Sequence, residues 1–259
     1  MAPLLVLVAL VGLAIGSFLN VVIWRVPRGE SVVAPPSACP SCGNAIRNRD
    51  NVPVVGWLLL RGRCRDCGDP ISGRYPLVEL ACGAIFVVMA LRIGADAALP
   101  AYLYLAAVGL ALAVIDIDVK RLPDVLTLPS YGVMAVLLSV AALVHHDWAP
   151  LIRAVEGGAA VFAVYFALWF AYPSGMGFGD VKLSGVLGGY LGWLSWSAVG
   201  VGVFLGFLYG AVFGIGLLLF AGGDRKTKVP FGPFMLAGAL TGILVGTQLV
   251  DAYLSLTIG

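Results

Sequence analysis

Three carboxylates lie where the sequence could do chemistry in an otherwise apolar chain. Asp180 follows two glycines in the stretch Gly-Met-Gly-Phe-Gly-Asp-Val-Lys-Leu, residues 175–183. Asp116 and Asp118 end another apolar run, in the stretch Val-Ile-Asp-Ile-Asp, residues 114–118. Because an ionisable side chain in a membrane span is costly unless it is paired or solvated, both stretches are candidate functional sites.

The residues around Asp180 suit a site that a substrate can approach. Gly177 and Gly179 have no side chains, so backbone or an extended substrate strand could come close to the carboxylate. Such a carboxylate requires a partner, and the stretch 114–118 supplies one. Two carboxyls held together can share one proton, so that the ionised one activates water and the neutral one polarises a carbonyl.

The composition sets the class of protein in which these carboxylates must be positioned. The chain has 259 residues, of which 60% are hydrophobic and 12% charged, with a mean hydropathy of +0.98. Soluble domains are only about 45–50% apolar, so the sequence predicts a multi-span membrane protein. A net charge of +2 is too small to indicate nucleic-acid binding. The first apolar run lacks a basic leading region and a cleavage site, so we read it as a retained span.

Apolar runs long enough to cross a bilayer predict an all-α polytopic fold with about eight transmembrane helices. The predicted spans are residues 2–24, 76–93, 99–117, 124–145, 151–172, 181–196, 197–221 and 232–256. Seven spans is the alternative, because residues 192–197 leave little room for a turn between the sixth and seventh runs. Glycines 202, 206 and 210 have the spacing of a close helix contact.

The basic residues predict the orientation of these spans. With eight spans, 14 of the 16 Lys and Arg residues fall on one side, and only Arg92 and Arg153 lie opposite. The positive-inside rule makes the basic side cytoplasmic, which places Asp116 and Asp180 at cytoplasmic helix ends and both termini outside. The 14 residues are Arg25, Arg28, Arg47, Arg49, Arg61, Arg63, Arg65, Arg74, Lys120, Arg121, Lys182, Arg225, Lys226 and Lys228.

The sequence divides into a first span (1–24), a loop domain (25–75) and a membrane domain of about seven helices (76–259). The loop carries two Cys-x-x-Cys pairs with 21 residues between them, Cys39 with Cys42 and Cys64 with Cys67. Four thiolates in this arrangement suit tetrahedral zinc, and the metal would then fold a small zinc-ribbon-like domain. Redox or disulfide pairing and unliganded thiols are the alternatives, but a cytoplasmic loop disfavours permanent disulfides. Cys82 lies in a span and suits packing.

Three other polar residues have open interpretations. Asp118 could cap its helix or form an ion pair with Lys120 or Arg121 at the membrane surface. Lys182 could extend its ammonium group toward the membrane surface or offset the charge of Asp180. Glu79 could act in function or in structure.

Several segments together resemble one family over nearly the whole chain. They are residues 16–27 (Gly-Ser-Phe-Leu-Asn-Val-Val-Ile-Trp-Arg-Val-Pro), the double Cys-x-x-Cys loop, and residues 71–80, 115–124 and 175–183. In this order they are similar to bacterial type IV prepilin peptidases. A lone Gly-x-Gly-Asp also occurs in presenilin-like aspartic proteases, so the resemblance depends on all five segments.

The resemblance implies an aspartic endopeptidase of the bacterial inner membrane. It would cut the basic leader from prepilins or pseudopilins after a glycine, and methylate the new amino terminus with S-adenosylmethionine in those members that do so. The family's catalytic aspartates correspond to Asp116 and Asp180. Its zinc cysteines correspond to Cys39, Cys42, Cys64 and Cys67. Ser174 stands where members often have an acidic residue.

The resemblance also implies partners, namely the prepilin substrates, membrane lipid and a pilus or secretion assembly machinery, with no nucleic acid. The alternative function is a transporter whose carboxylates bind protons or cations. A transporter should have acidic residues at the bilayer midplane on broken helices, often within an internal repeat. The sequence shows neither feature, and the double Cys-x-x-Cys loop favours the peptidase. An inactive assembly protein would be expected to lack one of the two aspartates.

Overall fold

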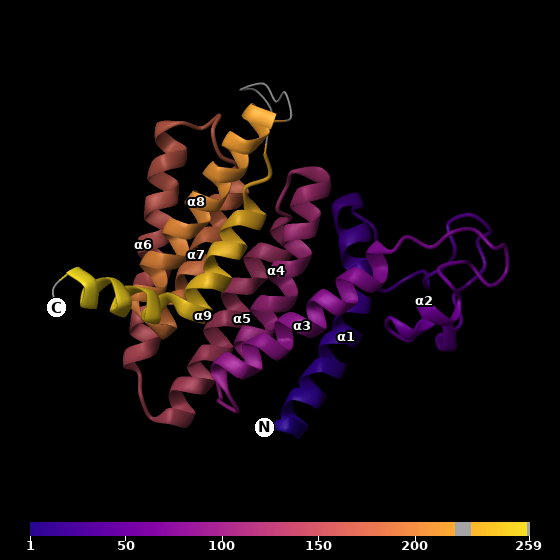
Figure 1. Cartoon of the computed structure of the whole chain (residues 1–259), viewed down its shortest axis with the longest axis horizontal. Helices are drawn as coiled ribbons and strands as arrows, with labels where there is room; N and C mark the ends of the chain where they lie inside the picture. Colours follow the sequence, from indigo (N-terminus) through magenta and orange to yellow (C-terminus); the bar gives the residue numbers. More distant parts are fainter. Residues whose placement is uncertain (221–228, 258–259) are drawn as a thin grey trace. The chain divides into compact units, whose positions relative to one another are not determined.

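The computed structural model describes residues 1–220 and 229–257, and this part of the chain is almost entirely helical (Figure 1). It contains no β-strand, only two isolated bridges. The helices are α1 (Ala2–Arg25), α2 (Val55–Leu59), α3 (Arg74–Ile93), α4 (Leu99–Val119), α5 (Asp124–His145), α6 (Ala149–Ala171), α7 (Phe178–Leu194), α8 (Trp196–Phe220) and α9 (Gly232–Thr257), with 3-10 turns at Val26–Arg28 and Asn48–Asp50. The all-α polytopic fold predicted from the sequence is confirmed. Arg225, Lys226 and Lys228 lie outside the described residues.

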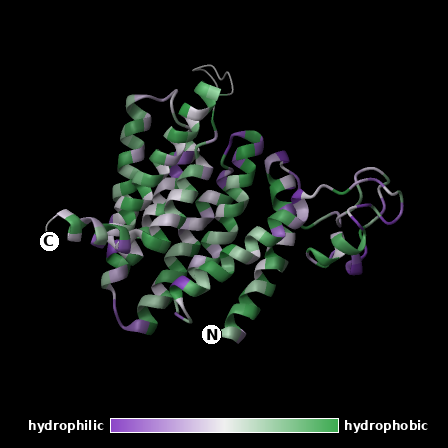
Figure 2. Cartoon of the chain, viewed as in Figure 1, coloured by the Kyte–Doolittle hydropathy of each residue, from purple (hydrophilic) through white to green (hydrophobic). Residues whose placement is uncertain are grey.

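Seven of the described helices are long and apolar enough to cross a membrane, namely all the long ones except α7. Helix α7 has 17 residues and corresponds to the predicted sixth span. One residue, Ser195, separates it from α8, and this residue makes the turn in an extended conformation. The short connection that suggested seven spans therefore joins two separate helices. Hydrophobic residues cover the helices, and hydrophilic residues gather in the loop before α3 (Figure 2).

The chain forms two compact units, residues 1–111 and 112–259. In the first unit, α1 packs against α3 through small residues. A Cβ atom on Gly12 would lie 2.8 Å from Gly83 Cα, and one on Gly16 would lie 2.7 Å from Glu79 Cα. Without a hydrophobic driving force between helices in lipid, such close backbone contact is what holds two spans together.

In the second unit, α7 is the buried element, and α5, α6, α8 and α9 all contact it. Its glycines allow this: a Cβ atom on Gly188 would lie 2.5 Å from the carbonyl oxygen of Gly157 in α6. Helices α8 and α9 approach in the same way, because a Cβ atom on Gly242 would lie 2.9 Å from Gly202 Cα. The predicted packing role of Gly202 is therefore confirmed. A helix enclosed by neighbours has little lipid contact, so α7 can be short.

The far end of α7 is capped by a side chain of α6. The Arg153 guanidinium donates to the carbonyl oxygens of Gly192 and Trp193, at 2.7 Å in both cases. The last carbonyls of a helix have no partners within it and carry partial negative charge, so a guanidinium satisfies and stabilises them. Arg153 thereby fixes the C-terminal end of the helix that begins at the Gly-x-Gly-Asp stretch.

Candidate functional site: two buried carboxyl groups

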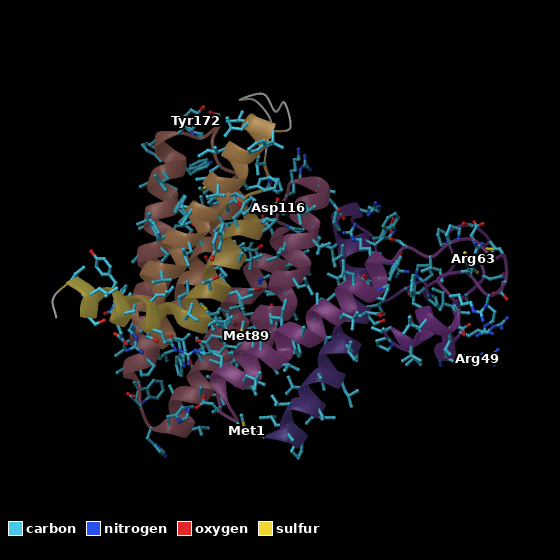
Figure 3. All side chains as sticks on the ribbon, in the orientation of Figure 1. Met1, Arg49, Arg63, Met89, Asp116 and Tyr172 are labelled. Atoms are coloured by element: carbon cyan, nitrogen blue, oxygen red, sulfur yellow. The ribbon has the colours of Figure 1, made fainter. Side chains whose placement is uncertain are left out.

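Asp116 lies in the last turn of α4 (Figure 3). The residue is 5% exposed. Its Oδ2 atom accepts the backbone N–H of Gly232, the first residue of α9, at 2.9 Å. A carboxylate at the C-terminal end of its own helix is electrostatically unfavourable, whereas the N-terminal end of another helix attracts it. The start of α9 therefore supplies the stabilisation that α4 cannot.

Asp180 lies in the first turn of α7 and is 7% exposed. Its Oδ2 atom accepts the N–H of Gly177 at 3.1 Å, while its own N–H donates to the Gly177 carbonyl at 3.1 Å. This reciprocal pair of bonds begins the helix, as in a capping box. Asp180 therefore occupies a fixed position and is bonded at a helix N-terminus, as Asp116 is.

Leu122, in the connection between α4 and α5, lies against the helix starts that hold both carboxylates. A Cβ atom on Gly179 would lie 3.1 Å from Leu122 Cβ, and one on Gly232 would lie 3.2 Å from Leu122 Cδ2. Asp116 and Asp180 are close enough to interact electrostatically. The structure thus brings together the two aspartates that the sequence singled out. Gly179 approaches a leucine of the same chain, whereas the sequence interpretation expected backbone or substrate there.

The other predicted polar residues lie apart from this pair. Asp118 is exposed, because residues two apart on a helix point to different sides. Lys182 does not neutralise Asp180: its Nζ atom donates to both carboxylate oxygens of Asp124, each at 2.8 Å. Glu79 is buried in α3 and accepts the N–H of Val54 at 2.6 Å, so it fastens the loop to the membrane helices.

Sequence reasoning missed Gly232 and Tyr131, which both contact the stretches around the aspartates. Gly232 donates to Asp116 across 116 residues of sequence, and Tyr131 Oη donates to the carbonyl oxygen of Lys182 at 2.6 Å across 51 residues. Neither residue belongs to a recognisable sequence motif. The only available signal was that Gly232 opens the last apolar run.

The four loop cysteines form a compact cluster. The Sγ atoms of Cys39, Cys42, Cys64 and Cys67 lie within 4.8 Å of one another, and those of Cys39 and Cys67 are 3.8 Å apart. Zinc–sulfur bonds of about 2.3 Å in a tetrahedron place the sulfurs about 3.8 Å apart. A disulfide needs about 2.05 Å, and all four cysteines are free thiols. The donor set therefore fits zinc.

The two halves of this cluster have the same local structure. Gly43 and Gly68 adopt φ values of +73° and +77° directly after each Cys-x-x-Cys pair, a backbone conformation that glycine allows in a tight turn. Their N–H groups donate to the carbonyls of Cys39 and Cys64, at 2.9 and 3.0 Å. Backbone N–H groups of Cys42 and Ser41 lower the pKa of Cys39 to about 7, whereas desolvation and hydrogen bonds with the other thiols raise the pKa values of Cys42 and Cys67.

Ion pairs connect the cluster to the rest of the loop. Arg65 forms two bonds to the carboxylate of Asp50, at 2.6 and 2.8 Å, and Arg47 bonds to Asp66 at 2.8 Å. The hydrogen bond from Arg65 holds the pKa of Asp50 below its usual value. Each pair joins residues far apart in the loop, so they align its two halves.

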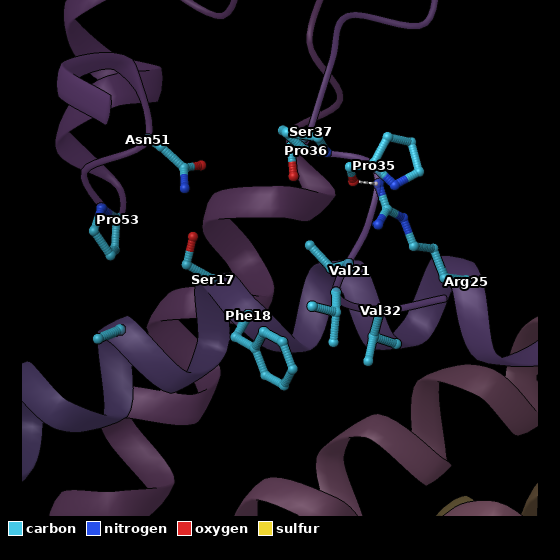
Figure 4. A pocket seen from close by; sticks show the side chains of 12 residues that line it. Ser17, Phe18, Val21, Arg25, Val32, Pro35, Pro36, Ser37, Asn51 and Pro53 are labelled. Atoms are coloured by element: carbon cyan, nitrogen blue, oxygen red, sulfur yellow. Dashed lines mark hydrogen bonds between the residues drawn. The ribbon is translucent and has the colours of Figure 1, made fainter. Parts of the chain in front are cut away.

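A cavity of about 390 Å³ lies between α1 and the loop (Figure 4). Ser17 and Phe18 of α1 face Asn51 and Pro53 of the loop across it. Its one charged side chain is Arg25, whose guanidinium donates to the carbonyl oxygens of Ser31 and Pro35 at 2.9 and 2.8 Å. The lining contains no carboxylate.

The fold and this site define the class: a multi-pass membrane protein with two interacting, buried aspartates at helix ends and a four-cysteine loop. Two family models match the chain. "Bacterial Peptidase A24 N-terminal domain" matches residues 10–93, and "Type IV leader peptidase family" matches residues 103–247, which is more than half of the chain. The chain belongs to the type IV leader peptidase family.

Curated relatives agree with this assignment. The chain is 37% identical to a prepilin leader peptidase/N-methyltransferase of Aeromonas salmonicida, over 96% of this chain and 93% of the relative. It is 34% identical to the Pseudomonas aeruginosa protein of the same name, over 95% and 91% of the two chains. The Klebsiella pneumoniae protein of that name is 42% identical, over 70% and 82%. No solved structure matches the chain.

Proposed function

We propose that this chain is an aspartic endopeptidase of the bacterial inner membrane that removes the leader of type IV prepilins or pseudopilins after a glycine. Asp116 and Asp180 are its catalytic pair. The supporting observation is that α4, α7 and α9 hold two buried, interacting carboxyls, one at each of two helix N-termini, in a member of a leader peptidase family. A transporter is not favoured, because the matching family and relatives are peptidases.

Hydrolysis follows from sharing one proton between the two carboxyls. The ionised carboxylate takes a proton from water as the water oxygen attacks the scissile carbonyl carbon, and the neutral carboxyl donates its proton to the carbonyl oxygen. The resulting gem-diol collapses when the carboxyl that took the water proton donates it to the leaving nitrogen. The other carboxylate takes a proton from a diol hydroxyl, so the C–N bond breaks, a carboxylic acid forms and the pair again holds one proton. Gly232 and Gly177 hold the carboxylates through their N–H groups throughout.

Zinc, bound by Cys39, Cys42, Cys64 and Cys67, is the structural metal of the loop in this proposal. When bound, it cross-links the two halves of the loop, and it takes no part in hydrolysis. The division of the chain into a first span (1–24), this loop domain (25–75) and a peptidase membrane domain (76–259) belongs to the same proposal. Loops of this size without a core generally need such a staple.

N-methylation of the new amino terminus is the second activity in the proposal, because the relatives are named as methyltransferases too. S-adenosylmethionine would be the methyl donor. The cavity beside α1 does not fit its cationic sulfonium, since Arg25 is the only charged side chain there. No residue is therefore assigned to the donor. Transfer of labelled methyl groups to the cleaved pilin tests this activity.

The loop domain and both aspartates face the cytoplasm in this proposal, as the distribution of Lys and Arg favours. A pilus or secretion machinery would then receive the processed pilin. Single-cysteine variants in intact cells test the orientation. Labelling of residues 25–75 by an impermeant reagent from outside the cell would overturn it.

The experiment for the peptidase itself uses purified protein in lipid and a prepilin with a glycine-terminated leader. The expected result is cleavage directly after that glycine. Transport is tested on the same vesicles, by following proton and cation flux. Flux without cleavage would replace the peptidase with the transporter.

A further inference from the structure

The start of α7, which carries Asp180, is held by α5 through one residue, Lys182. The ammonium group of Lys182 donates to Oδ1 and Oδ2 of Asp124, the first residue of α5, at 2.8 Å each. Its Nζ atom also lies 5.3 Å from the ring centre of Phe178, the first residue of α7. The Lys182 side chain therefore joins the first turn of α5 to the first turn of α7.

The backbone of Lys182 has a second attachment to α5. Tyr131 Oη donates to the Lys182 carbonyl at 2.6 Å. The tyrosine hydroxyl thus binds the backbone of the second turn of α7. Gly185 makes room for it, because a Cβ atom there would overlap the hydroxyl. Contacts of this kind fix where a helix lies and how it is rotated.

These contacts are poorly suited to a role in overall stability. Asp124 is 55% exposed and Lys182 24%, and an ion pair of that exposure adds only about 0–1 kcal/mol. They involve the residue two positions after Asp180, which points to another side of the helix. They therefore determine the position of the Asp180 backbone and leave its carboxylate free for chemistry.

We propose that Asp124, Tyr131 and Lys182, which we name the α5 clamp, are positioning residues for Asp180. The inference rests on the proposed peptidase function, in which Asp180 must be held at a fixed distance from Asp116. Loosening the clamp keeps both carboxyl groups in the protein but lets the first turn of α7 shift. A misplacement of about 1 Å is enough to cost about 100-fold in rate.

The test compares Tyr131→Phe with Tyr209→Phe. Each variant removes one hydroxyl that bonds between helices, since Tyr209 Oη lies 3.2 Å from Thr241 Oγ1 between α8 and α9. Cleavage of a prepilin should show kcat reduced about tenfold by Tyr131→Phe, with KM within about twofold, because only the reacting group is displaced. Tyr209→Phe should leave both constants near those of the parent.

Charge exchange tests the other half of the clamp. Lys182→Met should reduce kcat, Lys182→Arg should retain most of it, and Asp124→Lys combined with Lys182→Asp should recover activity that either single change loses. A residue that acts only on stability would lower kcat in proportion to the folded fraction, which a thermal melt of each variant measures. Equal kcat for Tyr131→Phe and Tyr209→Phe, or no recovery in the exchanged pair, would overturn the inference.

Amide hydrogen exchange separates failure of the clamp from failure of the peptidase assignment. Amides of residues 178–183 should exchange faster in Tyr131→Phe than in Tyr209→Phe, whatever reaction the protein catalyses. If amide exchange is faster in Tyr131→Phe but the parent protein cleaves no prepilin, the clamp is supported and the proposed function is wrong. If amide exchange is the same in both variants and the parent protein cleaves prepilin, only the clamp is wrong.

Discussion

Replacement of Gly232 by alanine should damage catalysis while leaving the fold intact. A Cβ atom on Gly232 would lie 2.9 Å from Asp116 Oδ2 and 3.2 Å from Leu122 Cδ2, so the carboxylate must turn away or α9 must shift. The backbone of Gly232 is not in the left-handed region, so alanine fits the helix itself. The change therefore acts through the new methyl group and the bond from the Gly232 N–H.

The expected loss can be worked from that bond. A hydrogen bond to a charged group contributes about 1.5–3 kcal/mol. If all of it is lost in the transition state, the rate falls by about 10- to 150-fold, at 1.36 kcal/mol per factor of ten. Since the atom that must move is the end of a side chain, the thermal midpoint should change little.

The assay measures kcat on a reconstituted prepilin beside a thermal melt of the same preparation. Gly200→Ala is the matched control, because it places a methyl group on α8 where no atom lies within 4 Å. Gly200→Ala should cleave like the parent. A Gly232→Ala protein whose turnover is within about twofold of that control would refute the role given to the start of α9.

Three other predictions concern the loop and the packing. Purified protein should contain about one zinc per chain, and Cys39→Ser should reduce it and destabilise the loop, as metal analysis and proteolysis would reveal; a metal-free parent would contradict this. The pKa of Asp50 is lowered by Arg65, so this bond stabilises the loop above about pH 4 and is lost as the pH falls through the lowered value. The stability of Asp50→Asn should therefore depend less on pH in this acid range than that of the parent. An equal pH dependence of stability in the two proteins would contradict this. Gly188→Ala should lower the thermal midpoint, because its methyl group would overlap a backbone carbonyl of α6, whereas Gly214→Ala, which meets open space, should not.

The sequence was sufficient for the order of the long helices. Of the eight predicted runs, however, only seven are long and apolar enough in the described structure to cross a membrane, because α7 has 17 residues. The sequence was less accurate at the start of α7. The apolar run begins at residue 181, but the helix begins at Phe178, because the Asp180 carboxylate bonds the N–H of Gly177 and starts the helix earlier. A polar residue just before an apolar run can therefore begin a helix.

Contacts between distant residues could not be predicted from one sequence. The pattern left Lys182 with two interpretations, and the structure gives a third, an ion pair with Asp124. Nothing in the sequence distinguishes Gly232 from the other helix glycines, although its N–H donates to Asp116. In both cases the deciding fact is which helix ends meet, and helix packing alone determines that.

The most direct test of the account is the effect of Asp116→Asn and Asp180→Asn, singly and together, on cleavage of a glycine-terminated prepilin leader, with membrane insertion checked in parallel. Each single variant should lose activity by orders of magnitude while remaining inserted. The double variant should be hardly worse than either, because groups that act as one unit are not additive. Asp118→Asn, which changes an exposed carboxylate on the same helix, is the control and should be milder. Near-normal turnover by either Asp116→Asn or Asp180→Asn would contradict the paired-carboxyl mechanism.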